Sequence, residues 1–244
     1  MDGLKKIQQI TSALRGRKVL VIATSNRWSG ADDEPKSTQL AKMIAEETGG
    51  QFIDASKLLI HVCEGNVSSA KGNYCGVKDA MLKDPEKNPT GHHRCWASIN
   101  HKDDELWKVS KAIFESDVVL FFASVRWGQT NSIHQKLMER LCWLENRHST
   151  LKEDNILANK DAGIVLVGHN WNGENTLHIQ KDVLQFYGFR VPEWLSFNWQ
   201  WTDDSSDETA KGYLEDAKDF ASEFGLGPKW LAESFKKWFG QNNE

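Results

Sequence analysis

The chain has 244 residues, with 30 Lys plus Arg against 34 Asp plus Glu and a formal net charge of −4. This balance gives no electrostatic reason to expect nucleic acid or an anionic membrane as a partner, so a small-molecule ligand is favoured. Four cysteines, no apolar leader and no run of the roughly 20 apolar residues that cross a bilayer predict a cytoplasmic protein without disulfides.

The first predicted elements are a helix and a buried strand. Apolar residues recur at helical spacing within residues 1–17, which indicates a short packing helix. Residues 18–26 read KVLVIATSN, an apolar run rich in β-branched residues that ends in small polar ones. Such a run is typical of a strand buried on both faces in mid-sheet. A polar loop follows, and residues 36–48 have the spacing of an amphipathic helix.

The junction between that strand and that helix has the composition of an anion-binding site. Free backbone N–H groups and the positive end of the helix dipole lie at a helix start, and neighbouring hydroxyls can supplement them around a phosphate. The hydroxyls belong to Ser25, Ser29, Ser37 and Thr38. The alternative is a capped helix start that binds nothing.

Strand and helix patterns then alternate along the chain. Strands are expected at 51–60, 117–124, 162–168 and 190–198, and helices at 103–115, from residue 133 and from residue 177. This alternation predicts a parallel sheet with helices on both faces in one domain, because each crossover returns the chain to the same end of the sheet. Polar loops after three of the strands should therefore meet at the carboxyl edge, where open α/β sheets bind ligands.

Two stretches fall outside the alternation. Residues 61–103 are polar and interrupted by glycine and proline, and we interpret this insertion as a candidate lid, since loops of such length are usually lids, binding loops or interface arms. Residues 205–244 carry two helical patterns, the last rich in Trp and Phe. We interpret the tail as an interface element, with a membrane-surface helix as the alternative.

Three motifs carry a resemblance to a known family. Residues 18–26 followed by Ser37-Thr38 are similar to its strand and phosphate loop, and Ala123–Gly128, ASVRWG, is similar to its Ser-Pro-x-Tyr-Trp-Gly loop. Gly168–Gly173 matches the position of its third, Gly-rich loop. On these motifs, which cover about residues 18–198, the chain resembles the flavodoxin-like NAD(P)H-dependent FMN reductases, including relatives of the iron–sulfur flavoproteins.

The resemblance implies a five-stranded parallel sheet in the order 2-1-3-4-5, bound FMN, NAD(P)H as co-substrate, a quinone, flavin or similar flat electron acceptor, and a homodimer or homotetramer. The first loop would hold the FMN phosphate, Trp127 and its loop backbone would flank the isoalloxazine, and the third loop would follow the other edge of the ring. The residues implied are Ser25, Arg27, Ser37, Thr38, Ser124, Val125, Arg126, Trp127, Gly128, Gly168, His169, Asn170 and Gly173.

The chain departs from the family pattern at several positions. Ser124 stands where proline is usual, Arg126 where tyrosine is commoner, and the third loop has bulky residues at 169–171. Iron–sulfur relatives carry four cluster cysteines after the second strand. This chain keeps Cys63 and Cys75 there, so we expect no cluster.

Other readings of single residues and of the whole chain stay open. A zinc site among Cys63, Cys75, His92, His93 and Cys95 lacks the usual short spacing, and we expect no metal. A reactive thiol at Cys63 or Cys75 has no base placed beside it by the sequence.

Trp127 could pack in the core, and Arg126 could form a surface ion pair. The chain could also be a flavodoxin-type electron carrier, or a flavodoxin-like binding protein that has lost its cofactor. Catalytic residues are not assigned, because hydride transfer to a flavin requires no acid–base group.

Overall fold

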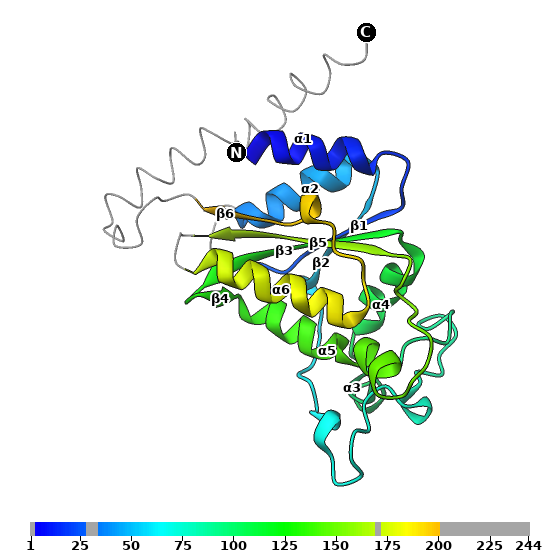
Figure 1. Ribbon diagram of the computed structural model, residues 1–244. Helices are drawn as coiled ribbons and strands as arrows, with labels where there is room; N and C mark the ends of the chain where they lie inside the picture. The colour runs from blue at the N-terminus through cyan, green and yellow to red at the C-terminus, as the bar shows by residue number, and fades with distance from the viewer. Residues whose placement is uncertain (1–2, 28–33, 169–171, 201–244) are drawn as a thin grey trace.

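The computed structural model of the chain describes residues 3–27, 34–168 and 172–200. An open sheet lies between two layers of helices (Figure 1). One layer holds α1 (Gly3–Leu14) and α2 (Lys36–Thr48), and the other holds α4 (Leu106–Glu115), α5 (Ser132–Ser149) and α6 (Gly173–Tyr187). The helices expected in residues 205–244 lie outside the described residues.

The sheet confirms the predicted topology. Its main strands are β1 (Val19–Ala23), β2 (Gln51–Asp54), β3 (Val118–Arg126), β5 (Asp161–Gly168) and β6 (Phe197–Gln200), in the order β2-β1-β3-β5-β6. All four pairings between them are parallel. Counted without the short β4 (Gln129–Thr130), this is the order 2-1-3-4-5. The order reverses between β1 and β3, so the crevice expected in this class of sheet lies at their carboxyl ends.

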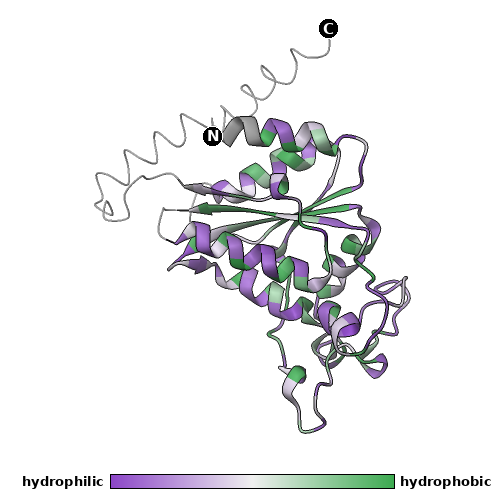
Figure 2. Cartoon of the chain, in the orientation of Figure 1, coloured by the Kyte–Doolittle hydropathy of each residue, from purple (hydrophilic) through white to green (hydrophobic). Residues whose placement is uncertain are grey.

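The continuous apolar run of β1 follows from its central position. Val19, Val21 and Ala23 pack in the cluster under α1 and α2, whereas Leu20 and Ile22 pack in the cluster under the other helix layer. Because successive side chains of a strand point to opposite faces, a strand covered on both faces has no polar face to display. Figure 2 shows hydrophobic residues along the strands and hydrophilic ones on the outward faces of α5 and α6.

Two parts of the sheet differ from the prediction. The last strand begins at Phe197 and not near residue 190, because Pro192 has no N–H to donate and a 3₁₀ turn, η4 (Glu193–Leu195), follows it. Arg190 makes only an isolated bridge with Asp161. β3 is also longer than predicted, and its last residues fold back onto β4 as an antiparallel hairpin.

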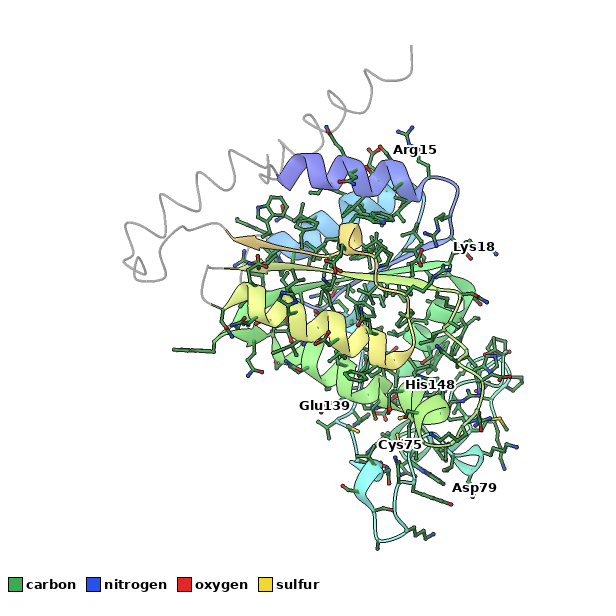
Figure 3. The ribbon with its side chains drawn as sticks, viewed as in Figure 1. Arg15, Lys18, Cys75, Asp79, Glu139 and His148 are labelled. Carbon is green, nitrogen blue, oxygen red and sulfur yellow. The ribbon has the colours of Figure 1, made fainter. Side chains whose placement is uncertain are left out.

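The insertion is a packed segment with short helices. It contains η2 (Asn66–Ser68), η3 (Lys78–Ala80) and α3 (Trp96–Asn100), and it follows η1 (Ala55–Lys57). Side chains of α5 hold its backbone: Arg140 donates to the His61 carbonyl at 2.7 Å, and Arg147 donates to the His92 carbonyl at 2.9 Å. Figure 3 labels Cys75 and Asp79 in this segment, below α5.

These contacts place the insertion away from the strand ends. α5 starts at the carboxyl edge of the sheet, and Arg140 lies eight residues into it, about 12 Å along the axis at 1.5 Å per residue. The segment therefore packs beside the second half of α5, which does not favour the lid that its length suggested. Within the described residues, no helix has the length and apolarity that crossing a membrane requires.

Candidate functional site

Hydroxyl groups gather where β1 ends and α2 begins. The side chains of Ser25, Ser37 and Thr38 are at most 2 % exposed, and the Ser37 hydroxyl donates to the Ser25 hydroxyl at 2.6 Å. The Thr38 hydroxyl has no hydrogen-bond partner within the described residues. Pro35 occupies the N-cap of α2 and offers no side-chain cap. Three of the four predicted hydroxyls thus lie together, and the fourth, that of Ser29, lies outside the described residues. The three do not cap the helix, which weakens the alternative reading of a simple capped start.

Asn131 joins the end of β1 to the end of β3, a role that the sequence did not reveal. Its amide nitrogen donates to the Thr24 carbonyl at 2.8 Å, and its amide oxygen accepts from the Ser124 N–H at 3.1 Å. The side chain is 2 % exposed. Because these bonds tie the ends of both strands together, the backbone around Ser124 is fixed in place.

Arg126 joins the first loop to the second. Its guanidinium donates to the Asn26 carbonyl at 2.9 Å, and it forms no ion pair within the described residues. Arg27 is exposed in the first loop, so each of the two loops carries a guanidinium group.

Trp127 and Gly128 form the two-residue turn between β3 and β4. Their φ angles of 51° and 67° are those of the left-handed turns that fit the twist of a tight hairpin. The Trp127 side chain is 91 % exposed, which excludes core packing as its role. The Gly128 carbonyl accepts from the Asn172 amide at 2.8 Å and the Thr176 hydroxyl at 2.9 Å, so the start of α6 holds the turn in place.

The glycines of the third loop have packing roles of their own. A Cβ on Gly168 would lie 2.8 Å from Val125 Cβ, and a Cβ on Gly173 would lie 2.5 Å from the Asn198 amide. Both positions therefore need glycine whether or not a ligand binds there. The amide nitrogen and oxygen of Asn198 are buried, and neither has a partner within the described residues. His169 and Asn170, the other predicted residues of this loop, lie outside the described residues.

His134, in the first turn of α5, is completely buried. Its ring nitrogens face the Thr24 hydroxyl at 3.4 Å and the Gln180 side-chain oxygen at 3.1 Å. Burial lowers the pKa of His134 to about 4, and the hydrogen bond with Gln180 opposes that shift. The imidazole is therefore neutral near pH 7 and is a core residue whose two ring nitrogens both have partners.

The chain's cysteines gather beside α5 without forming a tight ligand set. Cys75 and Cys142 have their sulfur atoms 3.5 Å apart, and Cys63 hydrogen-bonds Cys142. The Cys63 bond lowers the pKa of Cys142, but the bond with Cys75 and burial outweigh it and raise that pKa to about 12. The hydrogen bond with Cys142 and burial also raise the pKa of Cys63 well above its ordinary value. A neutral thiol is a poor nucleophile, so a reactive thiol at Cys63 is not favoured. Among the described residues, the group close enough to share a metal ion is instead His61, His101 and Asp103.

Comparison with known proteins supports the fold. No protein-family model matches the sequence, and no curated protein does either. The structure of RosB with a bound 8-demethyl-8-formylriboflavin-5'-phosphate intermediate aligns with a TM-score of 0.52 and 14 % identity, over 91 % of this chain and 81 % of that one. An azoreductase from Bacillus anthracis str. Sterne aligns with a TM-score of 0.48 and 12 % identity, over 84 % and 97 %. At 14 % identity the likeness to the RosB structure establishes the flavodoxin-like fold alone.

Proposed function

We propose that the protein is an FMN-dependent NAD(P)H oxidoreductase that passes reducing equivalents to a quinone, a flavin or a similar flat acceptor. The observation that carries the proposal is the Thr38 hydroxyl, which has no partner among the described residues and lies beside the Ser25–Ser37 pair. These groups lie at the start of α2, next to the reversal of strand order between β1 and β3. Both features favour a phosphate-bearing ligand at this edge.

The first loop would hold the phosphate. A buried hydroxyl without a partner is unfavourable by about 1–3 kcal/mol, and a phosphate oxygen that accepts from Thr38 would remove that penalty. Ser37 could turn its donor from Ser25 to the same phosphate, because hydroxyl hydrogens rotate to suit their acceptor. Arg27 would add positive charge from the same loop.

The second loop would flank the ring. Bound FMN supplies the hydride and electron chemistry, so the protein needs to bind, orient and shield. Trp127 offers an exposed aromatic face, and the bonds from Asn172 and Thr176 to the Gly128 carbonyl keep its turn fixed. Arg126, which reaches across from the second loop to the first, would close the side of the crevice. The predicted roles of Ser124, Val125, Gly168, His169, Asn170 and Gly173 along the ring belong to the same proposal.

The ligand held by the RosB structure, a riboflavin-5'-phosphate derivative, supports FMN as the class of cofactor. We extend the proposal to NADH or NADPH as donor, to a homodimer or homotetramer and to a cytoplasmic setting. Calibrated gel filtration would measure the oligomeric state. A monomer at all concentrations tested would contradict that part.

Anaerobic spectroscopy tests the function. We expect protein reconstituted with FMN to be yellow, to bleach on addition of NADH or NADPH, and to regain its colour when a quinone is added. A yellow protein that neither donor bleaches would indicate an electron carrier. A colourless protein that ignores added FMN would indicate a binding protein without the cofactor.

A further inference from the structure

Two imidazoles and a carboxylate converge at the base of the insertion. The rings of His61 and His101 stack with their centroids 4.1 Å apart and an interplanar angle of 11°. The Asp103 carboxylate lies 3.0 Å from His61 Nε2. One potential ligand atom from each of the three residues lies within 4.8 Å of the other two. In a tetrahedral site with bonds of about 2.0–2.1 Å, ligand atoms lie about 3.3 Å apart, so modest movement would suffice.

A fourth ligand is within reach. Glu64 Oε1 lies 3.7 Å from His101 Nε2. Both oxygens of Glu64 accept from the Asn100 amide at 3.0 Å, which fixes the carboxylate beside His101. Asn100 would thus act as the kind of outer partner that metal-bound carboxylates commonly have.

A buried ion pair holds the potential ligands from below. Asp104 and Arg140 have side chains that are 0 % exposed and are joined by two hydrogen bonds of 2.7 and 2.9 Å. Asp104 also accepts from the His61 N–H at 3.0 Å, and Arg140 donates to the His61 carbonyl at 2.7 Å. One network therefore fixes the backbone of His61 and of the residue next to Asp103. This gives the group a rigid support, which a loose surface cluster would lack.

We propose that His61, His101 and Asp103, with Glu64 as fourth ligand, bind one divalent transition-metal ion of the zinc class. Two neutral imidazoles with carboxylates form a donor set that suits Zn²⁺ and its neighbours and does not suit Mg²⁺ or Ca²⁺, which prefer oxygen ligands alone. The site is new relative to the sequence prediction, which considered cysteines and His92 and His93 only. The residues that the proposal uses are distinct from those proposed for FMN.

The position of the ligands indicates what the ion would do. His61 and Asp103 are the first and last residues of the insertion, so one ion would clasp both ends of the segment. The insertion consists mostly of irregular chain with short 3₁₀ turns, and a metal clip that closes a long loop stabilises such a segment. The ion would therefore act as a structural clasp.

Metal titration of the full-length chain, prepared without a polyhistidine tag, tests the proposal. Isothermal titration with Zn²⁺ should give one equivalent bound. Loss of one ligand in His101→Ala or Asp103→Asn should weaken it at least about tenfold, since even outer-shell changes cost 10–100-fold. His178→Ala, which removes an exposed imidazole on α6, should bind as the wild type does. Asp103 is 64 % exposed, so Asp103→Asn provides a variant that folds even if His101→Ala does not.

Two further readouts separate this site from the cysteines and from the flavin. The Co²⁺ complex should show d–d bands without thiolate-to-cobalt charge transfer, and Zn²⁺ should slow proteolysis within residues 61–103 in protein that contains no FMN. Absence of Zn²⁺ binding, unchanged affinity in both ligand variants, or a thiolate charge-transfer band would each overturn the proposal. None of these measurements depends on whether FMN binds.

Discussion

The hydroxyl of Ser37, in the first turn of α2, donates a hydrogen bond of 2.6 Å to the hydroxyl of Ser25, directly after β1. This bond joins the end of the central strand to the start of the next helix. It leaves the adjacent Thr38 hydroxyl buried without a partner among the described residues. We expect a phosphate oxygen to bind here, because the hydroxyl lies at a helix start and has no partner among the residues that the structure describes.

Thr38→Val tests that expectation, because valine keeps the shape and removes the hydroxyl. We expect FMN affinity to fall about 10–100-fold, as a hydrogen bond to a charged group contributes about 1.5–3 kcal/mol. The free energy of unfolding without FMN should stay the same or rise, since the lost hydroxyl had no partner. Thr11→Val on α1 removes a buried hydroxyl that bonds the Ile7 carbonyl and serves as the control. Wild-type FMN affinity in Thr38→Val would contradict the phosphate assignment.

Trp127→Ala should separate binding from stability. Because the side chain is 91 % exposed, the free energy of unfolding should change by no more than about 0.5 kcal/mol. FMN affinity should fall about two- to tenfold, the loss expected for one aromatic stacking contact of about 0.5–1.5 kcal/mol. Phe186→Ala removes another exposed aromatic side chain, from α6, and should leave FMN binding unchanged. Equal effects of the two variants would refute a stacking role for Trp127.

Asp104→Asn should destabilise the fold strongly. The change leaves the Arg140 guanidinium buried without a counter-charge, and breaking such a pair costs about 3–5 kcal/mol. Urea unfolding at neutral pH measures the loss. The double variant Asp104→Leu with Arg140→Met should recover part of it, because no uncompensated charge remains. A single variant as stable as the wild type would show that the pair does not hold the insertion.

Acid should destabilise the protein through two buried histidines. Burial is the main cause that lowers the pKa of His93 to about 3 and of His134 to about 4, from 6.5. As the pH falls below 6.5, the unfolded chain binds protons that the folded chain rejects, so the free energy of unfolding decreases. Each histidine lowers the free energy of unfolding by up to about 1.4 kcal/mol per pH unit, until the pH reaches its pKa in the folded chain.

Urea unfolding at a series of pH values measures this slope. His134→Gln and His93→Gln should each reduce it between pH 6.5 and about 4. If neither core variant changes the slope, other groups must account for the acid sensitivity.

Local patterns were enough to predict the sheet. The apolar run of residues 18–26 and its repeats at 117–124 and 162–168 predicted strands buried on both faces, and the structure confirms them. The start of the last strand was placed too early, because the prediction used apolar content and did not consider that Pro192 has no N–H to donate. The tight hairpin at Trp127 was missed, because its turn has two left-handed residues and one of them, Trp127, is not glycine.

Most of the polar framework was beyond the reach of the sequence. Asn131 reaches the Thr24 carbonyl 107 residues away, and Arg140 reaches Asp104 from a position 36 residues later. Such hydrogen bonds depend on how separate elements pack, so the spacing of residues along the chain does not predict them. The group of His61, His101 and Asp103 is formed in the same way, by the folding of the insertion on itself.

The most direct test of the central claim is a fluorescence titration of the colourless protein with FMN and, in parallel, with riboflavin. The two ligands share the isoalloxazine and differ in the phosphate. If the hydroxyls of Ser25, Ser37 and Thr38 hold that phosphate, FMN should bind at least about 100-fold more tightly than riboflavin, a difference of about 2.7 kcal/mol. Equal affinities, or no binding of either ligand, would contradict the account.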